Sequence, residues 1–347
     1  MKITIRGYIT HKEAEHYSDC ADRYAINTNS NRFAIADGVS KSFYPDIWAD
    51  ILVNNFVSSD KENEFSIKKC QSEWLEKVTE KVQSLDAKWY TKNAFVKKEA
   101  GLATLVTLRF ENGKWLADAL GDSFLFFVSK ESIGFNDWIK LSSKPAPVVF
   151  DSFPDYYSSR NKEHGSEKTI DEQDLGAGTF YLMTDALSEW VFSQKEKIIE
   201  EIKKWDSQEE FERSINELRS LNKLNNDDSA ILIIEIEDDE RTELTYEKNQ
   251  IQLIDKLIEK EKEEFTQQNT IEKKESFVEE VKVENQKNGE TEFASEKLEE
   301  KKGSDKPRDL FKYQRNKVID ELDKLNPDAR KEELINICKN YDISVTD

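Results

Sequence analysis

Acidic residues stand at the ends of short apolar runs in five places along the chain. The run RFAIA leads directly into Asp37 and Gly38, and the run FYLMT leads into Asp185. The full set is Asp22, Asp37, Asp122, Asp185 and Asp227. A carboxylate at the rigid end of a strand is well placed to bind a hard cation, although each position alone is more typical of a turn or a cap.

Carboxylates gathered at one edge of a sandwich repel one another unless cations lie among them. Ligand sets made only of oxygen suit Mg²⁺ or Mn²⁺, and two such ions can acidify a bridging water and hold a phosphoryl group for in-line attack. Other chemistries lack their motifs: the chain has no Walker loop and no Gly-x-Ser-x-Gly, and His11, His16 and His164 form no His-x-x-x-His pair.

Seven apolar runs of strand length position these acids. They are residues 2–9, 22–28, 32–37, 102–110, 114–128, 179–185 and 229–236. Residues 45–57 repeat their apolar side chains at helical spacing, residues 65–90 predict one longer helix, and residues 194–221 predict two more. Strands in hairpin-like succession with helices between them favour a sheet-and-helix sandwich over an alternating parallel sheet.

The charge and cysteine content of the chain restrict the partners, the metal sites and the location that we expect for it. The 347 residues include 51 Lys and Arg against 71 Asp and Glu, a formal net charge of −20, which disfavours binding to nucleic acid or to an anionic membrane. Three scattered cysteines, Cys20, Cys70 and Cys338, predict neither a disulfide framework nor a thiolate zinc site. With no signal-like or membrane-length apolar run, we expect a cytoplasmic protein.

The amino-acid composition of the chain changes near residue 236. Residues 1–237 predict the catalytic domain, and residues 238–306 are rich in Glu and Lys and predict a charged linker, partly helical and partly disordered. Residues 307–347 regain helical periodicity and predict a small hairpin that breaks at Asn326–Pro327. This hairpin could dock a protein partner, and a solvated charged tail without a partner is the equal alternative.

In this order, the acidic segments resemble the motifs of the metal-dependent protein phosphatases, the protein phosphatase 2C family, over roughly residues 1–237. Asp22 resembles the second residue of the family's Glu-Asp motif, and Asp37 with Gly38 resembles its Asp-Gly motif. GLATLVTLRF and ADALGDSFLFF resemble the Gly-Ser-Thr strand and the Gly-Asp-Ser-Arg hairpin, while LMTDALSEW and DDSAILII resemble the late Asp-Gly motif and the closing Asp-Asp-x-Thr strand. The resemblance is to bacterial-type members, which commonly tolerate the change of the His after Asp-Gly that stands here as Val39.

The resemblance implies an α+β fold: a four-layer α/β/β/α sandwich of two antiparallel sheets flanked by helices, here followed by a charged, partly helical C-terminal extension. It implies two Mn²⁺ or Mg²⁺ ions at one edge of the sandwich, with Asp122 near a third, weaker position.

Carried over residue by residue, the resemblance gives each acid a role. Asp37 would bridge the two ions, and the Gly38 carbonyl would reach the second ion. Asp185 and Asp227 would complete the protein ligands of the first ion. Asp22 would orient a metal-bound water, which makes Asp22 and Asp37 the candidate catalytic residues.

The chain departs from the family pattern in the loop before residue 22. Ala21 replaces the Glu of the Glu-Asp motif, and Asp19 could supply the missing carboxylate. Tyr17 stands about where the family has the Arg that binds the substrate phosphate. His16 or Lys12 could provide positive charge from the same loop.

Other departures are smaller. Three positions differ from the motifs: Val39 after the first Asp-Gly, Ala186 in place of the late Gly, and Ala230 in place of the closing Thr. In the closing strand Asp227 needs no gap, and Asp228 and Asn226 lie one step away.

Three hypotheses for function follow. The first is an active Ser/Thr phosphoprotein phosphatase in which water attacks without a covalent intermediate; its partners would be a phosphoprotein substrate and a Ser/Thr kinase. The second is a degenerate relative that binds a kinase or phosphoprotein without turnover. The third treats the C-terminal tail as an adaptor carried by the folded part.

Overall fold

The computed structural model describes residues 1–60, 64–85, 87–150, 154–238 and 244–266. The chain divides into two units, one made of Met1–Ser84 with Ala94–Thr270 and the other of Leu85–Asn93 with Ile271–Asp347. The second unit is described only at residue 85 and at 87–93, where helix α3 (Trp89–Val96) begins. The predicted hairpin at 307–347 and most of the predicted linker lie outside the described residues.

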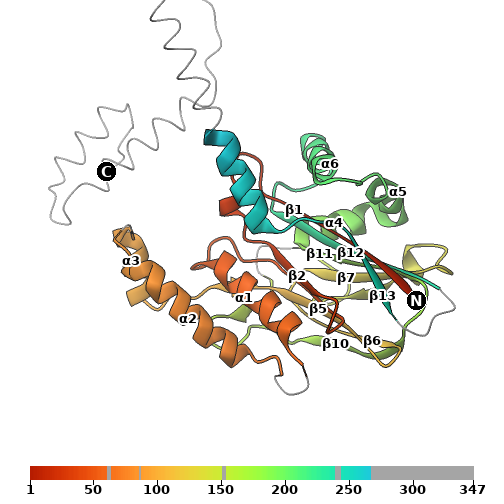
Figure 1. Ribbon diagram of the computed structural model, residues 1–347, viewed down its shortest axis with the longest axis horizontal. Coiled ribbons are helices and arrows are strands. Elements are labelled where there is room, and N and C mark those ends of the chain that lie inside the picture. Colours follow the sequence, from red (N-terminus) through yellow and green to blue (C-terminus); the bar gives the residue numbers. More distant parts are fainter. Residues whose placement is uncertain (61–63, 86, 151–153, 239–243, 267–347) are drawn as a thin grey trace, which may run out of the picture. The chain divides into compact units, whose positions relative to one another are not determined.

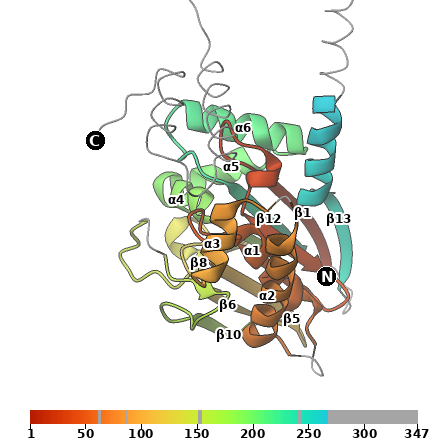
Figure 2. The same cartoon turned by 90° about the vertical axis from the view of Figure 1, so that its left-hand side faces the viewer.

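The first unit contains two main sheets (Figures 1 and 2). In spatial order the first sheet consists of β13 (Thr245–Ile251), β1 (Lys2–Thr10), β12 (Ser229–Glu237), β11 (Gly178–Met183), β7 (Phe124–Ser129) and β8 (Ile139–Leu141). The second consists of β10 (Lys168–Asp174), β6 (Lys114–Leu120), β5 (Leu105–Glu111), β3 (Arg32–Ala36) and β2 (Arg23–Asn27). Every pairing in both sheets is antiparallel except that of β13 with β1.

Helices cover the outer face of each sheet (Figure 1). Helices α1 (Pro45–Ser58) and α2 (Ile67–Gln83) share an apolar cluster with β3 and β5. Helices α4 (Asp185–Gln194), α5 (Ile198–Ile202) and α6 (Gln208–Ser220) share another with β7, β11 and β12. A third cluster, which includes Phe33, Val106, Leu182 and Leu232, lies between the sheets. The predicted α/β/β/α sandwich of two antiparallel sheets is confirmed.

Strand β12 shows why the apolar runs form buried strands. Its side chains alternate between the two faces of the sheet. Leu232 and Ile234 enter the cluster between the sheets, whereas Ile231 and Ile233 enter the cluster under the helices. Because both faces are covered, the run reads as continuous Ile and Leu instead of alternating with polar residues.

Short elements complete the chain. They are β4 (Leu102–Ala103), which pairs with β9 (Tyr157–Ser158), and the 3₁₀ turns η1 (Tyr17–Asp19), η2 (Phe135–Asp137) and η3 (Lys195–Lys197). All seven predicted strand runs are found. The single helix predicted over 65–90 instead ends at Gln83, where Ser84 adopts extended backbone angles.

The sheet extends past residue 237, where the sequence pattern changes. Strand β13 adds to the edge of the first sheet beside β1, and residues 254–266 form a helix. Tyr246 and Leu257 pack against the cluster between the sheets. These polar segments contribute only a few apolar side chains to the core, so their place in the fold depends on contacts with the N-terminal strand β1. Within the described residues, no helix combines the length and apolar character needed to cross a membrane.

Candidate metal centre

The strand ends that carry the five acids meet at one end of the two sheets. Asp22 and Asp37 come together because Arg23 pairs with Ala36 across the β2–β3 hairpin. Asp185 begins α4 directly after β11, and Asp227 precedes β12, which pairs with β11. Asp122 lies in the turn between β6 of the second sheet and β7 of the first. Both sheets therefore contribute carboxylates to one place.

Asp37 is the common neighbour in this cluster. Its pKa is raised well above the ordinary value, first by burial and then by the negative charges of the other four acids. Those acids are Asp185, Asp22, Asp122 and Asp227. Charge–charge effects of this kind require short distances in a protein interior. The structure thus brings together all five acids that the sequence singled out.

The same causes act on the other acids. Burial raises the pKa of Asp185 to about 8, and the charges of Asp122 and Asp227 add to the rise. Burial likewise raises the pKa of Asp22 well above its usual range, with Asp228 and Asp185 as the next causes, while the Thr184 hydroxyl opposes the rise. At neutral pH such a cluster needs protons or cations to be stable.

Asp22 provides the clearest test of fit for a cation. Asp22 is 1% exposed, and neither carboxylate oxygen accepts a hydrogen bond of normal geometry from the described residues, although the Thr184 hydroxyl lies near enough to lower its pKa. A buried carboxylate without a partner is costly, and a nearby divalent cation or its water shell would satisfy it. Asp37, Asp185 and Asp227 are only partly buried, so the cluster is open to ions on that side.

The donor set suits Mg²⁺ or Mn²⁺, because every candidate ligand is a carboxylate or carbonyl oxygen. Among the residues that the structure describes, no three His, Cys, Asp or Glu side chains already stand in the arrangement of a closed metal site.

The backbone around Asp37 is held by Thr104. The Asp37 amide donates to the Thr104 hydroxyl over 3.1 Å, and the Thr104 amide donates to the Asp37 carbonyl over 2.8 Å. The Thr104 hydroxyl also lies 2.7 Å from the hydroxyl of Ser123, which follows Asp122. One buried threonine thereby links two of the acidic loops.

Gly38 is required by close backbone packing. A Cβ atom at this position would lie 2.9 Å from the carbonyl oxygens of both Ala21 and Pro45. Contacts this short exclude any side chain, so the glycine allows the loop after β3 to pass close to the loop before β2.

Asp227 and Asp228 have different surroundings. Asp228 is 4% exposed, and its two oxygens accept from the backbone amides of Lys12 (3.0 Å) and Ala21 (2.8 Å). These bonds join the loops before β2 and β12. Asp227 keeps a half-exposed side chain. The geometry therefore favours Asp227 as the ligand and Asp228 as the residue that fixes its loop. Asn226 instead accepts from the Glu13 amide at 2.7 Å.

The loop before residue 22 supplies one cation to the cluster. Lys12 Nζ lies 2.9 Å from Asp227 Oδ1. His16 pairs with Glu261 in the helix at 254–266, and the Tyr17 hydroxyl donates a hydrogen bond to Glu212 of α6. Asp19 is exposed, and its carboxylate accepts from the His16 amide. Of the alternatives in this loop, only Lys12 reaches the acids.

Sequence reasoning missed two polar residues of the site. Thr104 is fully buried between β4 and β5, and nothing in the sequence distinguishes it from Thr107. Lys144 lies 3.9 Å from Asp122, and its side chain is 9% exposed. It lies in the long segment after β8, where one lysine among many gives no signal.

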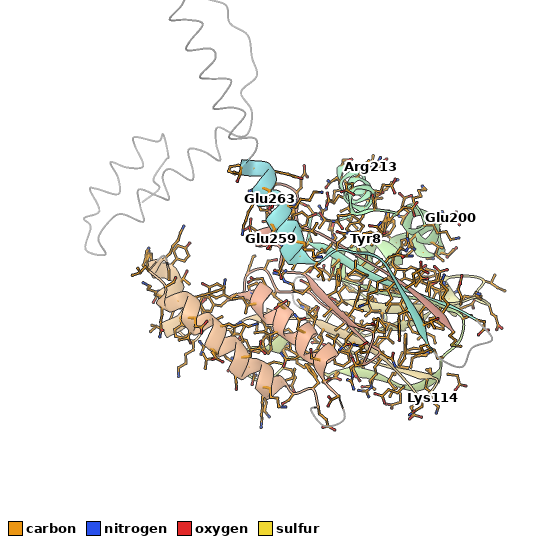
Figure 3. The ribbon with its side chains drawn as sticks, viewed as in Figure 1. Tyr8, Lys114, Glu200, Arg213, Glu259 and Glu263 are labelled. Carbon is orange, nitrogen blue, oxygen red and sulfur yellow. The ribbon has the colours of Figure 1, made fainter. Side chains whose placement is uncertain are left out.

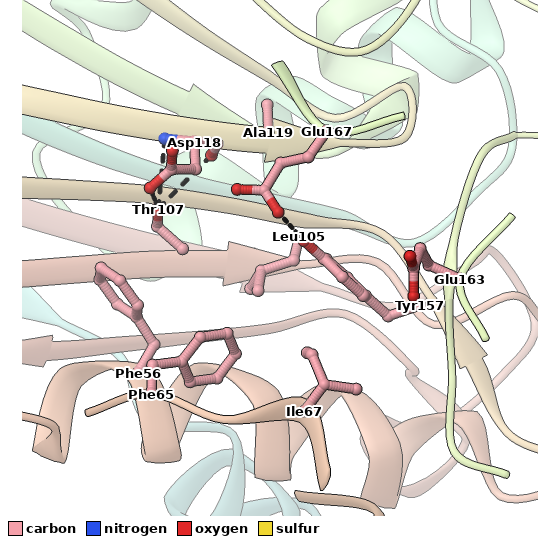
Figure 4. Close-up of a pocket in the computed structure, with 10 residues that line it drawn as sticks. All are labelled: Phe56, Phe65, Ile67, Leu105, Thr107, Asp118, Ala119, Tyr157, Glu163 and Glu167. Atoms are coloured by element: carbon pink, nitrogen blue, oxygen red, sulfur yellow. Dashed lines mark hydrogen bonds between the residues drawn. The ribbon is translucent and has the colours of Figure 1, made fainter. Parts of the chain in front are cut away.

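A cavity of about 330 Å³ lies between α1 and the second sheet, and none of the five acids lines it (Figure 4). Phe56 and Phe65 form one side, and Asp118 and Glu167 lie across from them (Figure 4). Its carboxylates are engaged by hydroxyl groups: Tyr157 donates to Glu167 over 2.5 Å, and Thr169 donates to Asp118 over 2.8 Å. This cavity is distinct from the acidic cluster. By contrast, the charged side chains of Glu200 on α5 and Arg213 on α6, labelled in Figure 3, are exposed.

No protein-family profile matches the chain, and no curated protein sequence matches it. Solved structures do match. The serine/threonine phosphatase PstP/Ppp of Mycobacterium tuberculosis is 11% identical, with 68% of this chain and 99% of that chain covered and a TM-score of 0.44. Stp1 of Staphylococcus aureus is 13% identical, with 67% and 95% covered and a TM-score of 0.46.

A further match is the catalytic domain of PstP in complex with 2 manganese ions, 12% identical, with 68% of this chain and 99% of that chain covered and a TM-score of 0.42. These solved structures are serine/threonine phosphatases, the kind of protein whose motifs the sequence resembles. Similarity this distant carries no argument about activity, which has to come from the site itself.

Proposed function

We propose that this protein is a metal-dependent phosphatase that hydrolyses phosphoserine or phosphothreonine in proteins. The observation that carries the proposal is the gathering of four carboxylates around Asp37, whose pKa is raised by burial and further by their charges. Such a cluster is destabilising by itself, and it persists at functional sites where a bound cation compensates it.

Two Mn²⁺ or Mg²⁺ ions, when bound, would supply Lewis acidity and a water with a lowered pKa. Asp37, the Gly38 carbonyl, Asp185 and Asp227 would hold these ions. Asp122 would serve a third, weaker position. Thr104 would keep Asp37 in place, because Thr104 forms hydrogen bonds with both the backbone amide and the backbone carbonyl of Asp37.

Asp22 would act on the attacking water. It is buried beside the cluster and has both oxygens available to accept a hydrogen bond. In this role it would orient the water and take up its proton as the phosphate ester is attacked.

A second candidate is a phosphoprotein- or kinase-binding protein without turnover. Ala21 stands where a second carboxylate would serve the other ion, and Tyr17 is directed toward α6. The two candidates share the cluster and differ in whether it hydrolyses substrate. Docking of a partner by residues 307–347 and a cytoplasmic location stay predictions.

The deciding experiment is hydrolysis of p-nitrophenyl phosphate and of a phosphothreonine peptide, with and without Mn²⁺. We expect Mn²⁺-dependent turnover that Asp37→Asn abolishes and that Asp19→Asn, an exposed acid of the neighbouring loop, leaves intact. Mn²⁺ binding measured by calorimetry without turnover in the wild-type chain would instead support the non-hydrolysing candidate. No turnover and no Mn²⁺ binding would overturn the site itself.

A further inference from the structure

The side chain of Lys12 spans two of the loops that carry the proposed ligands. Its Nζ atom lies 2.9 Å from Asp227 Oδ1, before β12, and donates to the Ser40 hydroxyl over 2.6 Å, in the loop after Asp37 and Gly38. The Lys12 side chain is 18% exposed. The ammonium group therefore lies beside Asp227, a candidate ligand whose side chain is 42% exposed.

The backbone of Lys12 is fixed independently of its ammonium group. Its amide donates to Asp228 Oδ1 over 3.0 Å, and the next amide, of Glu13, donates to Asn226 over 2.7 Å. The carbonyl of His11 accepts from Arg219 over 2.9 Å. A lysine head on a four-carbon stem can change partners while such a backbone stays in place.

The other cations near the cluster are held differently. Arg23 donates to the backbone carbonyls of Cys20 and Asp22, and Arg219 donates to the backbone carbonyl of Asp227. Lys144 Nζ lies 3.9 Å from Asp122 Oδ2. Lys12 is thus the cation that contacts the carboxylate of Asp227 in the described part of the chain.

A divalent cation and the Lys12 ammonium would compete for Asp227. Two cations held on one carboxylate repel each other strongly at a partly buried site, so a bound ion would weaken the hold of Asp227 on Lys12. The released ammonium would remain at the open side of the cluster, tethered close to Ser40. A lysine ammonium is a good partner for a phosphoryl oxygen.

We propose that Lys12 exchanges partners as the site fills: it neutralises Asp227 while no divalent cation is bound, and it binds a phosphoryl oxygen of the substrate once a cation takes Asp227. Lys12 is then a specificity-determining residue that couples metal binding to phosphate binding. The proposal rests on the proposed function, because it assigns a residue to that same site.

The exchange makes a reciprocal prediction. Since the metal frees Lys12 for phosphate, phosphate must also strengthen metal binding by the same factor. Removing the ammonium should tighten Mn²⁺ binding, because its competitor is gone, and weaken phosphate binding, because its partner is gone. A lysine that only stabilises the loops would change neither constant in this pattern.

The test is calorimetry on the full chain, with Mn²⁺ and inorganic phosphate as probes, for wild type, Lys12→Met and Lys41→Met. Lys41 is an exposed lysine of the Ser40 loop and controls for loss of one positive charge. For Lys12→Met we expect Mn²⁺ to bind about 5-fold tighter and phosphate, with Mn²⁺ present, about 10-fold weaker, in the usual range of coupling between sites. Lys41→Met should change each constant less than 2-fold, about 0.4 kcal/mol.

Unchanged or weaker Mn²⁺ binding in Lys12→Met would overturn the exchange, as would unchanged phosphate binding. If Lys12→Met does not fold, Ser40→Ala is tested in its place. This variant removes the hydrogen bond that Ser40 accepts from Lys12, which should raise the affinity for phosphate. An unchanged phosphate affinity in Ser40→Ala would overturn the proposal. Both readouts are binding constants. A wild-type chain that binds Mn²⁺ and phosphate with this coupling but hydrolyses no ester would refute the proposed enzyme and retain the exchange.

Discussion

Thr104 and Asp37 exchange two hydrogen bonds, one from the Asp37 amide to the Thr104 hydroxyl at 3.1 Å and one from the Thr104 amide to the Asp37 carbonyl at 2.8 Å. The pair joins the end of β3 to the start of β5. It fixes the backbone on which the central carboxylate of the cluster depends, and it does so with a side chain that is fully buried.

Thr104→Val should weaken Mn²⁺ binding about 10-fold or more, the usual cost of losing a residue that orients a ligand. It removes the acceptor for the Asp37 amide and should also cost about 1–3 kcal/mol of stability. The matched control is Thr107→Val, the same change at a buried threonine three residues along the strand. Calorimetry should separate the two variants, and equal Mn²⁺ affinities would contradict the positioning role.

Without metal, the chain should become less stable as pH rises. The folded-state pKa of Asp185 is about 8, against an ordinary value of 3.8, so between these values the folded state holds a proton that the unfolded state lacks. Unfolding then releases protons, and each such group lowers the free energy of unfolding by about 1.4 kcal/mol per pH unit within this window.

The measurement is the melting temperature in EDTA from pH 5.5 to 8.5. We expect it to fall over this range, and saturating Mn²⁺ should flatten the profile because the charged carboxylates are then compensated. A melting temperature that rises with pH in EDTA would show that the carboxylates do not repel one another in the folded chain.

Asp22→Asn should make the metal-free chain more stable while it abolishes turnover. The change removes a buried charge whose oxygens lack partners among the described residues. Substitutions that remove strain at a functional site commonly stabilise by about 0.5–2 kcal/mol. Denaturant unfolding in EDTA measures the gain, with Asp19→Asn as the exposed control; a destabilised Asp22→Asn would indicate that the carboxylate has a structural partner.

Gly38→Ala should destabilise the fold by about 1–3 kcal/mol, because the new methyl group would lie 2.9 Å from two backbone carbonyl oxygens. Gly176→Ala is the control, since a Cβ there meets nothing within 4 Å. Thermal unfolding of the two variants should differ clearly. If both melt together, the loops before β2 and after β3 can separate without cost.

A chain that ends at residue 240 should be less stable and more prone to aggregate than one that ends at residue 267. The shorter chain lacks β13, which leaves β1 as an open edge strand, and it loses the buried contact of Leu257. Light scattering and thermal unfolding compare the two. Equal behaviour would mean that residues 245–266 add nothing to the fold.

The acidic site was largely predictable because each of its acids is adjacent to its own strand. A run such as RFAIA is buried by its local pattern, and the residue that follows it must appear at the strand end, whatever the rest of the chain does. The core strands, the helices at α1, α5 and α6, and the five candidate acids all depend on signals of this local kind.

Tertiary structure alone decided the features that depend on partners far along the chain. Lys12 and Asp228 are 216 residues apart, and no local pattern distinguishes Lys12 from His16 as the cation of the site or Asp227 from Asp228 as the ligand. Strand β13 is polar and becomes a strand through its pairing with β1. Local periodicity of apolar residues specifies which segments are buried, and therefore which residues reach the edge of the sandwich. Long-range packing decides which of those residues come into contact.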